Sequence, residues 1–243
     1  MRSITLAIQT HNFNKRLCWM LSSVMEQYGD IPDIKIRLSH IQDSGVNEIR
    51  DMFPSLRIEL STYPDHLYFQ YRGLVRNRDL KDITGKPICD SDYILWADSD
   101  MVYPPNFFAE LKKKVDPDEK RMYFSRRAST HLEPTDNLID VYTYPCVIHD
   151  VWRKVSTLNS DLKSNIGAGY CHLANVSHLY NEHGGYYVDP AKNKDHAWSK
   201  YPKCRSDQQF RRRVGKCKID LPVQIHLQHT RASENRECLE DAR

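Results

Sequence analysis

The sequence contains 243 residues with a formal net charge of +3, and 40% of its residues are hydrophobic. This length suits one α/β domain, because domains commonly contain about 100 to 200 residues. A mean hydropathy of -0.66 and a charged fraction of 28% exclude a disordered or membrane-embedded class of protein.

Two features of the sequence bear on where the protein is located. The start of the chain holds only a short semi-apolar run, too short for a secretory segment or for the roughly 20 residues that span a bilayer. The 7 cysteines are odd in number and form no C-x-x-C pair, which argues against a disulfide framework and a zinc knuckle. We therefore expect a cytoplasmic protein without a membrane span.

Strand and helix patterns alternate in the first half of the chain. Apolar and β-branched runs favour strands, and apolar residues at helical spacing favour helices. The predicted order is strand 3–10, helix 16–28, strand 33–42, strand 56–60, helix 71–80, strand 93–97 and helix 107–115. This alternation predicts an α/β fold with a mostly parallel central sheet flanked by helices, in which ligands bind beyond the carboxyl ends of the strands.

The second half of the chain has a less regular pattern. Its predicted elements are strand 122–125, a polar loop at 130–137, strand 140–148, a helix near 174–181 and a helix at 208–213. Glycines cluster at 164–170 and 182–187, and their backbone freedom favours loops that shape a pocket. No internal repeat or Gly/Ser linker interrupts the chain, which favours a single domain.

Asp98 and Asp100 form the most informative motif. They follow the apolar run 93–97 directly and precede a proline-started helix. Carboxylate oxygens in this arrangement suit Mg²⁺ or Mn²⁺ bound to phosphates, and such an ion would neutralise a departing diphosphate. The alternative is a polar turn in which Asp100 caps the next helix.

Six segments resemble the family 2 type glycosyltransferases, which have the GT-A fold. They are ITLAIQTHN, IQDSG, RGLVRNRDLK, YILWADSDMVYPPNF, GAGYCHLANVSHLYNEHGGYY and KCRSDQQFRRRVGKCKID. The resemblance covers nearly the whole chain and implies one Rossmann-like GT-A domain over residues 1–243. Within it, residues 1–115 would form the nucleotide-sugar-binding half, residues 116–232 the acceptor-binding half and residues 233–243 a C-terminal tail.

The same resemblance implies roles for particular residues. The donor nucleotide sugar would contact Thr10, Asn12, Asp43, Arg76, Asp98 and Ser99, and the metal would bind Asp100 and His226. Residues on the acceptor side, or of undecided role, are Gly167, Gly169, His229 and Arg231. Asp207 is the candidate general base, although Ser206-Asp207 stands where the family usually has Glu-Asp.

Each of these roles has a simpler alternative. Arg76 would instead form a surface ion pair with Asp79 or Asp82, Asp207 would only cap its helix, and the histidines would be ordinary polar side chains. A second histidine group carries no metal prediction, because His172, His178 and His183 do not have the i, i+4 spacing of neighbours on one helix face.

These residues and the resemblance predict a glycosyltransferase dependent on Mn²⁺ or Mg²⁺. It would move a sugar, with inversion, from a nucleoside diphosphate sugar, with a UDP-sugar favoured, to a hydroxyl of a glycan. Residues 192–218 carry a net charge of +8, which favours an alternative acceptor, the hydroxylated bases of DNA, in a viral enzyme acting in the host cytoplasm. Two further alternatives are a non-catalytic module that binds sugar nucleotides or nucleic acid, and a nucleotidyltransferase.

Overall fold

The computed structural model describes the chain in nine segments. They are residues 2–10, 13–29, 31–39, 45–63, 72–82, 84–143, 145–158, 171–186 and 206–229, with the backbone alone at 37–39, 72–74 and 206–209. Predicted site residues Asn12, Asp43, Gly167, Gly169 and Arg231 lie outside the described residues.

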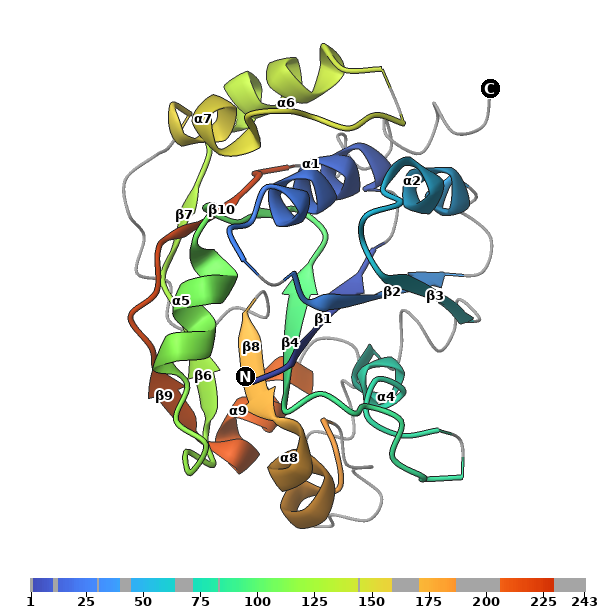
Figure 1. Ribbon diagram of the computed structural model, residues 1–243, viewed down its shortest axis with the longest axis vertical. Coiled ribbons are helices and arrows are strands. Elements are labelled where there is room, and N and C mark those ends of the chain that lie inside the picture. Colours follow the sequence, from blue (N-terminus) through green and yellow to red (C-terminus); the bar gives the residue numbers. More distant parts are fainter. Residues whose placement is uncertain are drawn as a thin grey trace.

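A seven-stranded sheet forms the centre of the fold (Figure 1). Its strands, in spatial order, are β3 (Ile58–Tyr63), β2 (Asp33–Ser39), β1 (Ile4–Gln9), β4 (Tyr93–Asp98), β8 (His172–Asn175), β6 (Met122–Phe124) and β9 (Lys216–Lys218). Only β8 runs antiparallel to its two neighbours, and the other pairings are parallel. The predicted mostly parallel α/β sheet is therefore confirmed.

Alternation along the strands creates two apolar layers. On β1, Ile4, Leu6 and Ile8 enter one buried cluster, whereas Ala7 enters the other. On β4, Leu95 and Ala97 join the first cluster and Ile94 and Trp96 the second. Successive side chains of a strand point to opposite faces, so a central strand with apolar residues at every position must be covered on both sides.

Helices cover both faces of the sheet (Figure 1). Those whose side chains enter the larger apolar cluster are α1 (Asn14–Met25), α2 (Val46–Met52), α5 (Phe107–Lys114), α6 (Leu132–Asp140) and α7 (Val151–Ser156). The other side carries α8 (Val176–His183) and α9 (Ser206–Val214), whose side chains enter the smaller cluster, and α4 (Arg72–Asn77), which contacts α9. None of the described helices is long and apolar enough to cross a membrane.

A second, three-stranded sheet joins the end of the chain to the middle. Its order is β5 (Met101–Val102), β10 (Gln224–His226) and β7 (Arg127–Ser129), and β10 pairs antiparallel with β5. The register places His226 opposite Met101, the residue that follows Asp100. This small sheet therefore carries the C-terminal histidine segment to the end of β4.

Two predictions for the second half of the chain were wrong. The expected loop at 130–137 and strand at 140–148 are replaced by α6, followed by turns and irregular backbone. The polar residues of this segment had favoured a loop, but Pro134 lies in the first turn of α6, where a missing N–H costs nothing. Strand β8 was also missed, and the predicted helix begins after it, where the Asn175 side chain accepts a 2.9 Å hydrogen bond from the His178 N–H.

Candidate functional site

Asp98 and Asp100 lie at the carboxyl end of β4 in different surroundings. Asp98 is the last residue of the strand and its side chain is 43% exposed. Asp100 follows in the turn before β5 and is buried, as is Ser99 between them. The two carboxylates therefore face different neighbours although only one residue separates them.

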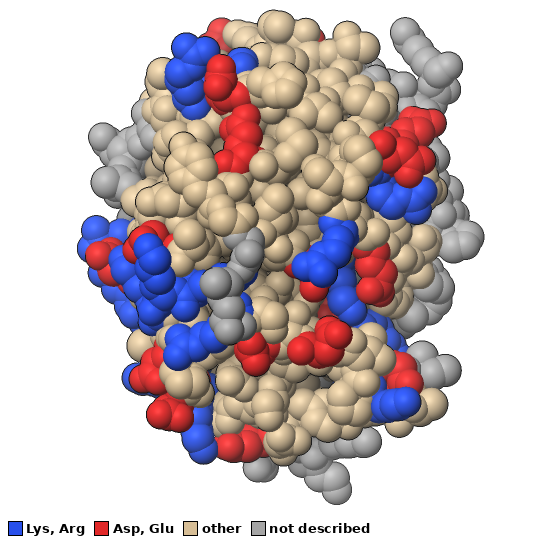
Figure 2. All heavy atoms as spheres, viewed as in Figure 1, with Lys and Arg blue, Asp and Glu red and all other residues tan. Residues whose placement is uncertain are grey.

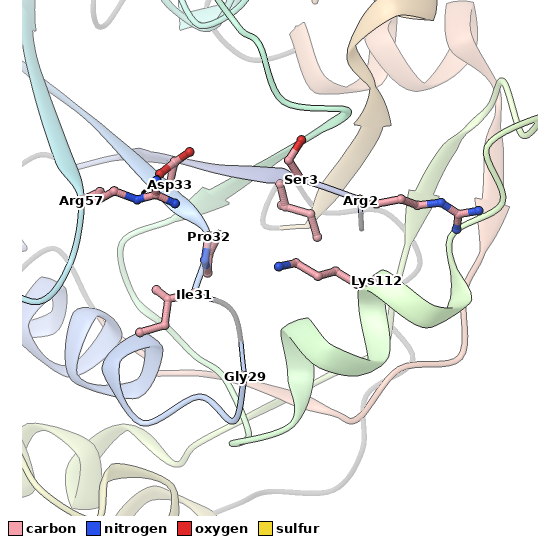
Figure 3. Close-up of a pocket in the computed structure, with 9 residues that line it drawn as sticks. Arg2, Ser3, Gly29, Ile31, Pro32, Asp33, Arg57 and Lys112 are labelled. Atoms are coloured by element: carbon pink, nitrogen blue, oxygen red, sulfur yellow. Dashed lines mark ion pairs between the residues drawn. The ribbon is translucent and has the colours of Figure 1, made fainter.

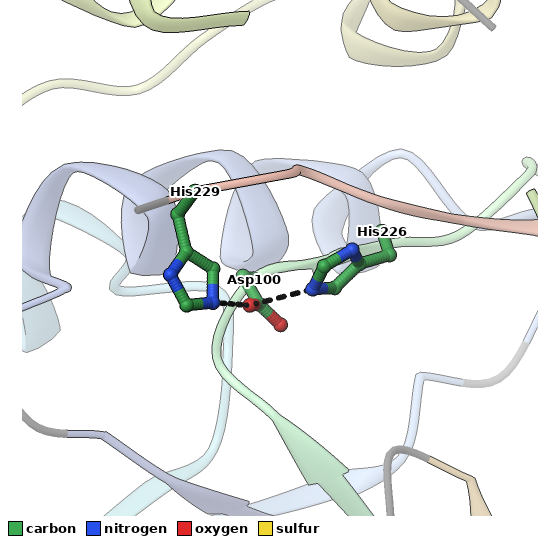
Figure 4. A group of neighbouring side chains, drawn as sticks. All are labelled: Asp100, His226 and His229. Carbon is green, nitrogen blue, oxygen red and sulfur yellow. Dashed lines mark ion pairs between the residues drawn. The ribbon is translucent and has the colours of Figure 1, made fainter. Parts of the chain in front are cut away.

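Two histidines converge on one oxygen of Asp100 (Figure 4). Asp100 Oδ2 lies 3.1 Å from His226 Nε2 and 3.2 Å from His229 Nε2. One ligand atom from each residue lies within 4.8 Å of the other two. The structure thus brings together Asp100 and His226, the two predicted metal ligands, and places His229, whose role was undecided, in the same group.

Backbone contacts fix the histidine segment beside Asp100. The Leu227 N–H donates to the Asp100 carbonyl at 2.8 Å, and the Thr130 N–H donates to the His226 carbonyl at 3.0 Å. The Gln228 N–H then donates to Thr130 Oγ1 at 3.0 Å. Residues 226–228 are therefore hydrogen-bonded to Asp100 on one side and to Thr130 on the other, which fixes the main chain that carries the two histidine rings.

Arg16 at the start of α1 supports the same segment. It is fully buried, and its Nη2 donates to the Gln228 carbonyl at 3.2 Å and to Asp136 Oδ1 of α6 at 2.9 Å. Its guanidinium lies 5.5 Å from the centre of the Phe13 ring, and that ring packs edge-on against His229. Burial lowers the pKa of Arg16, and the charges of Asp136 and Asp100 oppose this shift.

The electrostatics keep Asp100 ionised. Burial alone would raise its pKa, but the attraction and hydrogen bonds of His226 and His229 outweigh burial and hold the pKa well below its usual range. Its second oxygen, Oδ1, is buried and has no hydrogen-bond partner among the described residues. A buried carboxylate with an unsatisfied oxygen beside two imidazoles fits a divalent cation site.

Arg76 of α4 meets Asp98 on the other side of the motif. Its Nη2 lies 4.0 Å from Asp98 Oδ1, and its Nε donates to Gln9 Oε1 at 3.1 Å. Its Nη1 donates to the Tyr186 hydroxyl, and the guanidinium lies 4.8 Å from the centre of that ring. Arg76 is buried, so the alternative of a surface ion pair does not describe it.

Tyr186 connects Arg76 to α9. Its hydroxyl lies 3.0 Å from His172 Nδ1, and its ring stacks on Phe210 with centroids 4.2 Å apart. Arg213 of α9 donates to the carbonyls of Gly185 and Tyr186, both at 2.7 Å. The candidate base Asp207 lies in α9 one turn before Phe210, and only its backbone is described.

Thr10 completes the predicted residues that the structure describes. It is buried at the end of β1, beside the strand that carries Asp98. Sequence reasoning missed Arg16, Thr130, Asp136 and Tyr186 as parts of this region. The one available signal was the run of polar and basic residues that opens α1, because such residues seldom start a buried helix without a partner.

A cavity of about 430 Å³ lies at the opposite end of the sheet (Figure 3). It is lined by residues at the amino ends of β1 and β2, among them Ser3 and Asp33, together with Lys112 of α5. Arg57 pairs with Asp33 at 2.7 Å. None of the predicted site residues lines this cavity, so its volume does not mark the candidate site.

Comparison with known proteins gives a likeness of fold. No protein-family model and no curated protein matches the sequence. S. aureus TarS is similar with a TM-score of 0.60 and 13% identity, over 93% of this chain and 37% of TarS. TarS 1-349 in complex with UDP gives a TM-score of 0.59 and 12% identity, over 97% and 63% of the two chains. The glycosyltransferase GlyE of Streptococcus pneumoniae TIGR4 gives 0.51 and 10%, over 95% and 55%.

These likenesses show that the chain has a glycosyltransferase fold. The predicted fold class is confirmed at this level. At 10 to 13% identity the likeness concerns the fold alone, and the chain spans 37 to 63% of the length of these proteins. Reaction and substrates must therefore be argued from the residues of the site.

Proposed function

We propose that this protein is a metal-dependent glycosyltransferase of the family 2 type. It transfers a sugar from a nucleoside diphosphate sugar, with a UDP-sugar favoured, to a hydroxyl acceptor. The observation that carries the proposal is the group of Asp100, His226 and His229 at the carboxyl end of β4, within a glycosyltransferase fold. Complexes of TarS 1-349 with UDP and with UDP-GlcNAc support the choice of donor.

Asp100, His226 and His229 are the residues that would hold the metal. A bound divalent ion supplies positive charge for the departing diphosphate. The donor set favours Mn²⁺ over Mg²⁺, because imidazole nitrogen suits transition metals and Mg²⁺ prefers oxygen alone. We assign Asp98, Ser99, Thr10 and Arg76 to the donor, since a buried guanidinium beside the exposed Asp98 carboxylate suits a diphosphate or ribose.

The acceptor side rests on Asp207. We propose that its carboxylate takes the proton of the acceptor hydroxyl, which leads to inversion at the anomeric carbon. The stack of Tyr186 on Phe210 and the contacts of Arg213 support this role, because they fix α9, the helix that begins at Ser206. Residues 1–243 would form one catalytic domain that acts in the cytoplasm, with residues 116–232 as its acceptor-binding half.

Modified DNA is a second candidate acceptor. It is favoured by the net charge of +8 over residues 192–218, of which Arg211, Arg212 and Arg213 form the last turn of α9. Figure 2 shows Lys and Arg side chains interspersed with Asp and Glu on the face that it displays. The lysines of α5 give less support, because Lys113 and Lys114 pair with Glu110. Binding of duplex DNA that weakens steeply with salt would support this acceptor, and flat salt dependence would exclude it.

The proposed base is tested by turnover of UDP-sugars in the presence of Mn²⁺. We expect Asp207→Asn to lower kcat by roughly 100-fold or more while the Kd for UDP stays unchanged, because general-base catalysis contributes about 10²- to 10⁴-fold. Asp118→Asn, which changes an exposed aspartate that has no role in the proposed site, is the matched control. Parental kcat in Asp207→Asn would remove Asp207 from the mechanism.

A further inference from the structure

We propose that His178 and His183 form a second metal site, specific for transition metals such as Zn²⁺ and Ni²⁺. Both histidines lie in α8, on the face of the sheet that carries Trp96 and Phe210. Their Nε2 atoms share a hydrogen bond at 3.2 Å, whose proton a bound metal would replace, and their rings meet at 83°. Two nitrogens that bind one tetrahedral zinc at about 2.0–2.1 Å are separated by about 3.3 Å, so the pair is already spaced as two ligands.

Glu182 orients the first ring of this pair. Its Oε1 lies 3.0 Å from His178 Nδ1 and 3.1 Å from Lys120 Nζ. A carboxylate that accepts the Nδ1 proton fixes the tautomer in which the Nε2 lone pair is available, and this arrangement is common behind metal-binding histidines. The Nε2 of His178 therefore presents its lone pair on the side where His183 lies.

The second ring is positioned through its backbone. Arg213 of α9 donates to the His183 carbonyl, so the main chain that carries this imidazole is held in place.

The charges around this pair determine which ions it accepts. The Glu182 carboxylate lies behind the ring of His178, while Lys120 and Arg213 place two positive charges nearby. An ion held mainly by charge, such as Mg²⁺ or Mn²⁺, gains little binding free energy beside these two positive charges. Ions that form strong bonds to imidazole follow the order Mn²⁺ < Ni²⁺ < Cu²⁺ > Zn²⁺, so Ni²⁺, Cu²⁺ and Zn²⁺ bind and Mn²⁺ does not.

Binding at this site would stabilise the end of α8. His183 is the last residue of the helix, and the left-handed Gly184 follows it. The Gly184 carbonyl accepts a 2.7 Å hydrogen bond from Lys81 Nζ, which ties the turn to the end of the segment that carries Arg76. An ion that crosslinks His178 to His183 thus restrains the turn that leads to Tyr186.

The test uses the full chain with His226→Ala and His229→Ala, so that the first histidine pair cannot bind. Calorimetric titration with Zn²⁺ should show one bound ion, and adding His178→Ala or His183→Gln should abolish it. Glu182→Gln should weaken binding by roughly 10-fold or more. Saturation at about 100 times Kd should raise the Tm by about 5 °C, and Mn²⁺ should produce no such rise.

The exposed His149 provides the matched control, because His149→Ala removes a histidine remote from the pair. Zinc binding should be unchanged in that variant. The inference would be overturned if the His226→Ala/His229→Ala protein binds no zinc, or if its zinc binding persists after His178→Ala and His183→Gln. It does not depend on the proposed reaction, since the readout is metal binding alone.

Discussion

The part of the chain that the structure describes contains two histidine pairs, which differ in the position of the neighbouring carboxylate. At the C-terminal segment, His226 and His229 both approach Asp100, whose carboxylate lies between the two rings. At the end of α8, His178 and His183 approach each other directly, and the carboxylate of Glu182 contacts only the far nitrogen of His178.

The position of the carboxylate determines which ions each histidine pair should bind. A buried carboxylate between the rings adds negative charge and an oxygen ligand, which suits a hard or borderline ion such as Mn²⁺. A carboxylate behind one ring only orients that ring, and the two nitrogens remain as the ligands. The two pairs should therefore respond oppositely to the same change of metal.

The largest predicted effect comes from Asp100→Asn. The variant removes the carboxylate charge that distinguishes the first histidine pair from the second. We therefore expect Mn²⁺ binding to be lost and UDP-sugar turnover to fall by roughly 100-fold or more. Zinc binding at the α8 pair should remain. Metal titration with each ion measures both effects, and Asp118→Asn serves again as the control. Parental turnover in Asp100→Asn would contradict the metal assignment.

Gly185→Ala tests the turn that follows the second pair. Gly185 has φ +115, and an added Cβ would lie 2.5 Å from Asn77 Oδ1, so we expect a loss of about 2 kcal/mol of unfolding free energy. Gly184→Ala is the comparison, because nothing lies within 4 Å of its Cβ at φ +64, and we expect about 1 kcal/mol. Urea denaturation of both variants gives the difference, and equal losses would contradict this account of the turn.

Arg16→Lys tests the support of the first pair. A lysine cannot bridge Asp136 and the Gln228 carbonyl with the same fork, so we expect the Kd for Mn²⁺ to rise by about 10-fold. Manganese EPR measures this affinity. The effect should disappear when His229→Ala is already present, because Arg16 acts through the backbone next to His229. An equal loss with and without His229 would assign Arg16 to general stability instead.

Local patterns were sufficient to predict the centre of the fold. Strand β4, which ends at Asp98, is apolar at nearly every position because helices cover both faces of the sheet, and such runs can be recognised in a sequence. The same logic placed Thr10 and Asp98 at neighbouring strand ends. Helix α6 was missed because its polar sequence was interpreted as a loop, although Pro134 is tolerated in the first turn of a helix.

Contacts between distant residues could not be predicted in this way. Arg16 and Gln228 are separated by 212 positions, and only the pairing of β10 with β5 brings them together. The contact between His178 and His183 could not be predicted from helical spacing either, because His183 is the last residue of α8, next to the left-handed Gly184. Metal-binding geometry at a helix end therefore depends on the turn as much as on the helix.

Product analysis tests the central claim most directly. The protein is incubated with Mn²⁺ and a mixture of nucleoside diphosphate sugars, with a glycan or hydroxylated DNA as acceptor, and the products are identified by mass spectrometry. We predict that one sugar nucleotide is consumed, with release of its nucleoside diphosphate, and that Asp100→Asn abolishes this consumption. If the parental protein with Mn²⁺ leaves every sugar nucleotide intact, with no sugar transferred to the acceptor or to water, the proposed glycosyltransferase activity is contradicted.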